Sequence, residues 1–357
     1  FCTKEGIPLY YKVYEGNRND AKVFPEMLNA FRDFLKSKFG IKKINASDVT
    51  LIFDKGNNSK DNFEKLEKSG LNFIGSLKLC EHKDLAEISN RDKRFKQQTR
   101  KGMEGIKAFS VNKHVYGSDY TLVVMHNNKL FNDQWKTVNS DILKAIDRLS
   151  ELKQRLDDRN NGLIKGGKPP TQNSVDSQVK KILCRPFLQG VIEVDIRAGE
   201  KAPIVKFEFL ADKLEKIADT FLGKKIIIAK SDSDDIADII ETYHSQYIIE
   251  HVFKGMKDRD FGTWWPLFHW TDQKIHVHGL YCTIAVLLQA ILHRRIKTAG
   301  VNIPLKRMLK ELSGIKEVIN VFSKTGKKKK EKKQTTFTKL NPVQEKLFSL
   351  LFDSRRS

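Results

Sequence analysis

The chain has few cysteines, few prolines and no apolar run long enough to cross a membrane. Its four cysteines are widely separated and include no C-x-x-C pair, so neither a cysteine zinc site nor a disulfide framework is indicated. Nine prolines in 357 residues give no sign of disorder except near the C-terminal end. The longest apolar run, residues 279–292, is interrupted by Thr283 and Gln289, which favours a buried helix over a membrane span. No signal peptide is visible, and we expect a cytoplasmic protein.

Acidic residues are also in deficit. The chain has 65 Lys and Arg against 44 Asp and Glu, for a net charge of +21. Residues 324–333 contribute seven Lys against one Glu, so the rest of the chain still carries 21 − 6 = +15. The basic bias therefore belongs to the folded body and favours a polyanionic partner. Charge alone does not distinguish DNA from RNA or from an acidic surface.

Residues 233–258 show the pattern of one long helix. Acidic and serine residues at 232–235 supply a capping group and first-turn acids, and neither Pro nor Gly follows until Gly255. At about 100° per residue, Tyr243, Gln246, Glu250 and Lys257 fall within an arc of about 60° beside an apolar face. The sequence therefore predicts a helix with a narrow polar stripe along its core-facing side.

This stripe has two interpretations. It is either an ordinary solvated surface, with a Glu250–Lys254 pair worth a few tenths of a kcal/mol, or a functional face. Helical geometry alone favours the solvated surface.

A second candidate carboxylate, Asp54, follows a β-branched and aromatic run at residues 49–53. A strand that ends in a carboxylate, with Gly56 and two asparagines permitting a sharp exit, is where an α/β fold commonly presents its chemistry. Asp54 is equally suited to beginning a turn. The local sequence leaves both interpretations open.

The remaining elements follow from periodicity. Residues 1–15 predict two strands joined at a tight turn at Gly6, followed by an amphipathic helix at 21–38. Ser59 caps a predicted helix at 60–68. Further predicted strands lie at 71–77, 105–111, 120–126, 190–196, 204–209 and 224–230, with a long helix at 130–156.

Two aromatic or histidine features are better explained by packing than by ligand binding. Trp135 could stack on a base, but a lone Trp in a helical pattern is more often part of a core. His269, His276 and His278 suggest a metal cluster, yet residues two apart on a helix point in different directions.

Three blocks resemble one known family. Tyr-x2-Gln-x3-Glu-x6-Lys at residues 243–257 resembles the Tyr-Arg-Glu-Lys signature of DDE transposases from bacterial and archaeal insertion sequences, with Gln246 in place of Arg. The block VTLIFDKGNNSKDN at 49–62 is similar to the family's second-Asp motif. The G-x-P-L and G-N-x-x-D pattern at 6–20 is similar to the block that follows the strand bearing the first catalytic Asp.

The resemblance implies roles for particular residues. Asp54 and Glu250 would be catalytic metal ligands for two Mg²⁺ or Mn²⁺ ions, and the first Asp is expected upstream of Phe1. The residues expected to contact DNA are Tyr243, Gln246, Lys254 and Lys257.

The resemblance also implies a fold. We expect an α/β protein with a ribonuclease H-like mixed sheet flanked by helices and interrupted by a large α+β insertion. The expected segments are a first part of the core at 1–77, the insertion at 78–223, a second part of the core at 224–300 and a basic helical segment at 301–357.

The implied activity is cut-and-paste DNA transposition by phosphodiester hydrolysis and strand transfer. The implied partners are double-stranded DNA, both terminal inverted repeats and target, and a second copy on paired ends, in a bacterial or archaeal cytoplasm. Two alternatives stay open: a catalytically incomplete DNA-binding remnant, and a ribonuclease H-like nuclease that cuts without joining.

Overall fold

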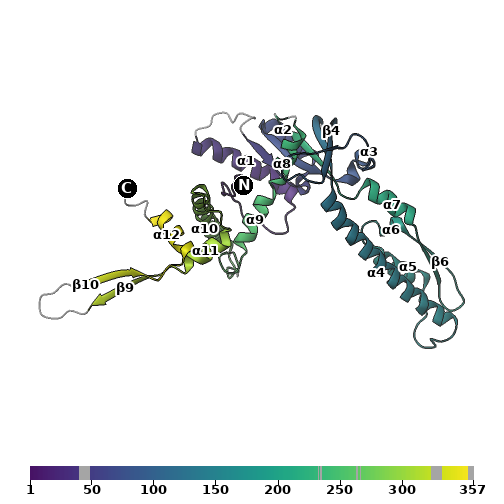
Figure 1. Ribbon diagram of the computed structural model, residues 1–357. Helices are drawn as coiled ribbons and strands as arrows, with labels where there is room; N and C mark the ends of the chain where they lie inside the picture. The colour runs from purple at the N-terminus through teal and green to yellow at the C-terminus, as the bar shows by residue number, and fades with distance from the viewer. Residues whose placement is uncertain are drawn as a thin grey trace. The chain divides into compact units, whose positions relative to one another are not determined.

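The computed structural model describes residues 1–39, 49–231, 233, 235–262, 264–265, 267–322 and 332–352. It divides into two compact units, one formed by residues 19–244 and the other by residues 1–18 together with 245–357. Figure 1 shows the elements of both units.

The unit of residues 19–244 is built on a six-stranded mixed sheet with the order β1-β2-β8-β5-β4-β3. Strands β1 and β2 are parallel, and every other neighbouring pair is antiparallel. The strands are β1 (Thr50–Ile52), β2 (Asn72–Leu77), β3 (Lys96–Gln97), β4 (Ile106–Val115), β5 (Ser118–Asn127) and β8 (Lys224–Lys230). The predicted mixed α/β fold is thus confirmed, and the predicted strand at 224–230 coincides with β8.

Helices cover both faces of this sheet because its central strands are apolar on both sides. Ile226, Ile227 and Ile228 of β8 are each 0% exposed. On one face, helix α8 (Ile236–His244) joins a core that includes Ile74 and Val123. The opposite face carries α1 (Asp20–Phe39) and α2 (Lys60–Ser69). The short elements of this part of the chain are η2 (Lys55–Asn57), η3 (Leu79–Glu81) and α3 (Lys83–Ala86).

A second core of the same unit lies outside the sheet. It joins the helices α4 (Asn128–Asn160), α5 (Gln172–Ile182), α6 (Leu188–Val191) and α7 (Ala211–Thr220) with the hairpin β6 (Ile192–Arg197) and β7 (Ile204–Phe209). Trp135 packs against this core and stacks on Phe131 at 6.2 Å between ring centroids, as the packing interpretation predicts.

The sheet topology differs from the segment boundary expected at residue 78. Strands β3, β4 and β5 lie between residues 96 and 127, yet they pair into the main sheet. The alternating pattern that predicted β4 and β5 as strands did not indicate their partner, because strand pairing across a sheet is a long-range choice. The elements outside the sheet run from residue 128 to residue 223.

The single helix predicted at 233–258 is wrong, since the structure forms two helices there. Helix α8 ends at His244, and α9 (Tyr247–Met256) begins after Ser245 and Gln246. The apolar faces of the two helices pack against different partners. Helix α8 packs against the main sheet, and α9 packs against the N-terminal segment. The polar sequence between them, whose serine competes for backbone hydrogen bonds, ends the first helix. Asp232 and Asp234 lie outside the described residues.

The N-terminal segment, predicted to be two strands, forms only one isolated bridge between Cys2 and Pro8 in the described residues 1–18. Gly6 does lie in the turn, with a φ of +77° that suits glycine. The remainder of this unit consists of α10 (Asp272–Thr298), α11 (Leu305–Ser313), α12 (Pro342–Phe352) and the hairpin β9 (Glu317–Phe322) and β10 (Lys332–Phe337).

Helix α10 corrects the prediction of a buried apolar helix. Of its side chains only Cys282 and Ile296, with the backbone of Gly279, are buried, whereas Tyr281 is 69% and Leu288 is 63% exposed. This helix is also long and apolar enough to cross a membrane, by length and composition only. An apolar run predicts the helix but not what covers it, because burial depends on segments far away in the chain.

Candidate functional site

Asp54 lies two residues beyond the end of β1, at the N-cap position of η2. Its backbone carbonyl accepts a hydrogen bond from the Asn57 N–H at 3.0 Å, so the chain does turn there. Its carboxylate makes no capping hydrogen bond, and the residue is exposed. Asp54 therefore begins a turn and also presents an uncommitted carboxylate at the end of the strand.

Aromatic packing fixes the strand end that carries Asp54. The ring of Phe53 lies 5.3 Å from that of Phe24 and 5.9 Å from that of Phe73, between ring centroids. Gly75 on the neighbouring strand makes room for it, since a Cβ there would come within 2.8 Å of the Phe53 ring. A glycine at this position is thus required for Phe53 to lie flat against β2.

Two asparagine side chains hold the loop that follows Asp54. Asn58 donates from Nδ2 to the Ser76 carbonyl at 2.8 Å. The buried Asn62 donates from Nδ2 to the carbonyls of Asn57 at 2.7 Å and Ala21 at 2.9 Å. Ser59 caps α2 by accepting from the Asn62 N–H at 3.2 Å, as predicted. The asparagines of this block therefore serve to position the loop.

Glu250 lies in the first turn of α9, in the other unit, and its side chain is exposed. The helix rests on the N-terminal segment, because a Cβ at Gly6 would lie 3.5 Å from Val252 and 3.6 Å from Ile248. In the described part of the chain no Glu250–Lys254 ion pair forms. The segment with the G-x-P-L pattern thus supports the helix that carries Glu250.

The four residues expected to contact DNA are divided by the helix break. Tyr243 is in α8, 6% exposed and part of the core beneath the sheet, with the Lys225 ammonium 5.5 Å from its ring centroid. Gln246 is the N-cap residue of α9, without a capping hydrogen bond from its side chain. Lys254 and Lys257 lie in the last turn and at the C-cap of α9, both exposed.

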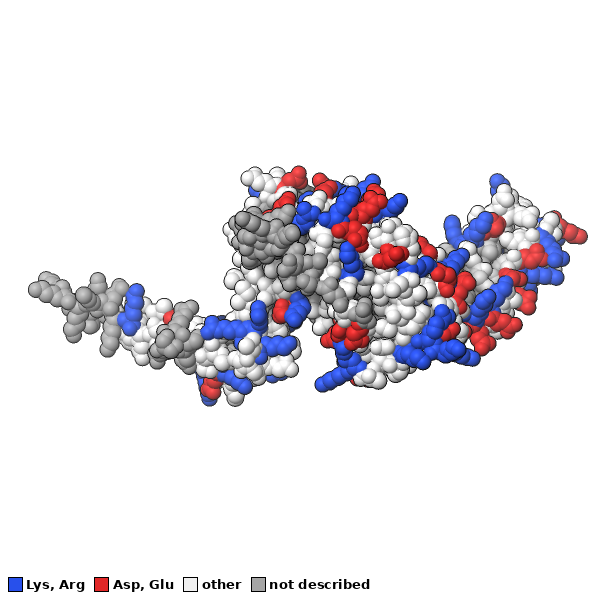
Figure 2. Space-filling view, turned by 90° about the horizontal axis from the view of Figure 1, so that it is seen from above, with Lys and Arg blue, Asp and Glu red and all other residues white. Residues whose placement is uncertain are grey.

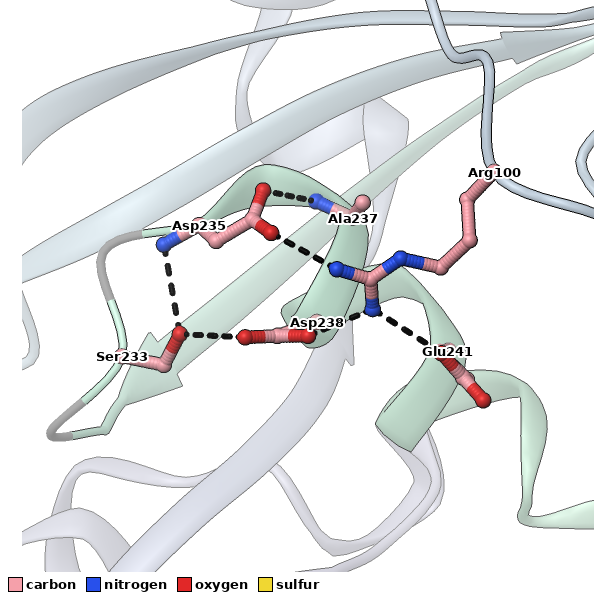
Figure 3. A network of polar contacts seen from close by, with 6 residues as sticks. All are labelled: Arg100, Ser233, Asp235, Ala237, Asp238 and Glu241. Carbon is pink, nitrogen blue, oxygen red and sulfur yellow. Dashed lines mark hydrogen bonds and ion pairs between the residues drawn. The ribbon is translucent and has the colours of Figure 1, made fainter.

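An ion-pair network that the sequence gave no sign of fixes the start of α8 (Figure 3). Arg100, from the loop between β3 and β4, binds Asp238 at 2.5 Å, Asp235 at 2.8 Å and Glu241 at 2.9 Å. Asp235 also caps the helix by accepting from the Ala237 N–H at 2.9 Å. The Arg100 contact, together with the Ser233 hydroxyl, holds the pKa of Asp238 below its usual range.

Asp54 and Glu250 each offer carboxylate oxygens, the ligand type that Mg²⁺ and Mn²⁺ prefer. Within the described residues, no group of three or more His, Cys, Asp or Glu side chains gathers in a metal-binding arrangement. In the histidine block, the ring of His278 lies 5.1 Å from that of His269 and 5.6 Å from that of Trp264, between ring centroids, whereas His269 and His276 are exposed.

The basic excess is spread over the surface. On the face drawn in Figure 2, Lys and Arg are interspersed with Asp and Glu. The lysine-rich run at 324–333 lies largely outside the described residues. A polyanion would therefore meet many separate cations on this face.

Comparison with known families decides the relationship. The sequence profile of the transposase DDE domain matches residues 1–288. The chain belongs to the transposase DDE domain family. Its mixed sheet with helices on both faces is consistent with a ribonuclease H-like transposase core. Curated proteins and solved structures gave no significant match.

For this transposase, membership makes DNA the substrate and transposition the general activity, and DDE transposases generally use divalent metal ions.

Proposed function

We propose that this transposase moves an insertion sequence by cut-and-paste, hydrolysing the strand at each element end and joining the freed 3′-OH to target DNA. The observation that carries the proposal is the pair of exposed carboxylates, Asp54 at a rigidly held strand end and Glu250 on α9, in two family motifs. We propose that residues 78–223 form the insertion, of which residues 128–223 lie outside the main sheet.

In the proposed mechanism, Asp54 and Glu250, together with the first Asp expected upstream of Phe1, would hold two Mg²⁺ or Mn²⁺ ions. Such ions, when bound, activate a water or a 3′-OH and neutralise the leaving oxygen. Phe53, packed against Gly75 and Phe73, holds the backbone next to Asp54 in place, which supports a role for this residue as a metal ligand.

Phosphate contacts are assigned to α9 and its N-cap. Lys254 and Lys257 are exposed and carry the charge for them, and Gln246 offers an amide where the family carries Arg. Tyr243 has only its 6% exposed edge for such a contact. Replacing Gln246 by Arg should therefore tighten binding to element ends, and unchanged affinity would contradict this assignment.

We further propose that two copies act on paired element ends in the cytoplasm, close to the nucleoid. Electrophoresis of complexes formed by tagged and untagged chains on one end sequence tests this. A mixed complex of intermediate mobility is expected, and its absence would contradict pairing.

The deciding experiment uses the parent protein, with the upstream segment expected to carry the first Asp, and compares Asp54→Asn and Glu250→Gln with the wild type on labelled duplexes carrying the element end. Each variant should lose more cleavage than the roughly 10–100-fold typical of losing an outer-shell partner of a metal site. DNA binding should persist, and wild-type cleavage should require Mg²⁺ or Mn²⁺. Glu64→Gln, an exposed carboxylate on α2, is the matched control and should cleave normally.

The alternatives give different results in the same assay. A DNA-binding remnant would bind with salt-dependent affinity and show no metal-dependent cleavage in the wild type. A plain nuclease would cut but would not join the 3′-OH to a second duplex.

A further inference from the structure

The hairpin of β9 and β10 is exposed on both faces. Figure 1 shows it projecting from α11 and α12. All of β9 is exposed, as are residues 333–337 of β10. Val321 is 57% and Ile319 is 55% exposed. An isolated two-stranded hairpin is marginally stable in water, so such a ribbon gains stability from whatever it binds.

The hairpin nevertheless stands on a fixed base. Thr338 donates from its N–H to the Lys316 carbonyl at 3.0 Å, and its hydroxyl accepts from the Lys316 N–H at 3.1 Å. Phe337 packs edge-on against Phe348 of α12 at 4.9 Å between ring centroids. Helix α12 is anchored by Leu347 in a small helical core with Met308. The hairpin is therefore a fixed arm.

The register places two amides opposite each other. Asn320 of β9 pairs with Gln334 of β10, so both side chains lie on the same face, and Thr336 and Val318 form the next pair on it. The side chains of Asn320 and Gln334 make no hydrogen bond within the described residues. Paired Asn and Gln side chains are suited to the donor and acceptor edge of adenine.

Charge decides the class of partner. Residues 316–339 contain nine Lys against two Glu. A second copy of the hairpin would bring the same positive charge against it, whereas a nucleic-acid backbone complements it. In size, six residues per strand span about 20 Å, and the major groove of B-DNA, about 12 Å wide, admits a two-stranded ribbon.

We propose that the β9–β10 hairpin is a DNA-binding ribbon that enters the major groove, with Asn320 and Gln334 reading adenine edges and Lys316 and Lys333 contacting phosphates. The proposal rests on the proposed function only for the identity of the partner. It adds a recognition site separate from the carboxylates.

The first test measures binding of the full chain to a fluorescein-labelled mixed-sequence duplex between about 50 and about 200 mM salt. Exchanging both lysines, Lys316→Gln with Lys333→Gln, should weaken binding about tenfold and reduce the salt slope by about 2. The control exchanges Lys153 and Lys180 for Gln, because each pairs with an aspartate on its own helix. An unchanged affinity and slope in the ribbon variant would overturn the proposal.

The second test concerns sequence preference. Asn320→Ala with Gln334→Ala should keep affinity for the mixed duplex within about twofold and lose an adenine preference of about fivefold or more in sequences selected from a randomised duplex pool. The same preference in wild type and variant would overturn the proposed reading of bases. Ribbon variants that instead change the sedimentation of the free protein would show a self-association surface and would overturn the proposal.

The two proposals fail separately. If the ribbon variants bind DNA normally and still cleave it, only the ribbon proposal is contradicted. Weaker binding by the ribbon variants, in a wild type that never cleaves, removes the transposase chemistry and supports the ribbon.

Discussion

At the scale of single residues, the position of Asp54 depends on a glycine in the neighbouring strand, Gly75. Gly75 lets Phe53 lie against β2, and Asp54 is the next residue in the chain. We expect Gly75→Ala to destabilise the protein by about 1–3 kcal/mol, because the added methyl meets the ring at 2.8 Å. It should also lower cleavage, since the strand end must shift.

Gly56 supplies the matched control for that prediction. It lies in the same motif, and no atom lies within 4 Å of a Cβ built on it. Gly56→Ala should therefore leave the urea midpoint and the cleavage rate nearly unchanged. Equal losses in the two variants would show that packing under Phe53 does not position the carboxylate.

The buried His126 should make the folded state less stable at acidic pH. His126 is 6% exposed, and burial, with the nearby Lys107 and Lys224, lowers its pKa to about 4 from 6.5, against an opposing effect of Asp219. Between these values the unfolded chain binds more protons than the folded one, so this stability is lost as pH falls from 6.5 towards 4.

His126→Gln should remove that part of the acid sensitivity. When the pH falls from about 7 to about 4.5, the free energy of unfolding should decrease by on the order of 2 kcal/mol more in the wild type than in the variant. Urea unfolding at each pH measures this. His114→Gln, whose side chain is 67% exposed, should behave as the wild type does. Parallel pH profiles for wild type and His126→Gln would contradict the assignment.

At the scale of elements, Arg100 adds ion pairs to the apolar packing that holds α8 against the sheet. We expect Arg100→Gln to lower the free energy of unfolding by about 1 kcal/mol, because three partly exposed carboxylates lose the cation that they share. Hydrogen exchange should accelerate first in α8. Lys113→Gln, which breaks a single pair with Asp84, should have a smaller effect, and equal exchange in both variants would contradict a special role for Arg100.

Local sequence predicted the elements whose own residue pattern is strong, whether their partners are near or far in the chain. The bounds of β7 follow from alternation, those of β8 from a short apolar run, and the start of α2 from the Ser59 cap. The end of α8 at His244 and the exposure of α10 could not be predicted, because each depends on which distant segment packs against the helix.

The same distinction holds for the candidate site. Asp54 and Glu250 are predicted as site residues because each lies in a motif with fixed spacing. Arg100 and Gly75 were missed because their roles depend on contacts with residues far away in the chain, which leave no local signature.

At the scale of the whole molecule, a net charge of +21 should dominate DNA binding. Affinity for a mixed-sequence duplex should fall by on the order of 10³ between about 50 and about 200 mM salt, as expected for about six phosphate contacts. Fluorescence anisotropy measures this. A flat salt dependence would mean that the cations do not face the DNA.

The division into units has a consequence for the order in which the protein is made. Residues 19–244 have been synthesised before α9 leaves the ribosome. The segment around Gly6, by contrast, can pack against Ile248 and Val252 only after α9 has been made. The unit that carries Glu250 therefore assembles after residues 19–244, and under the proposed function the nascent chain cannot cleave DNA before α9 has packed against the N-terminal segment.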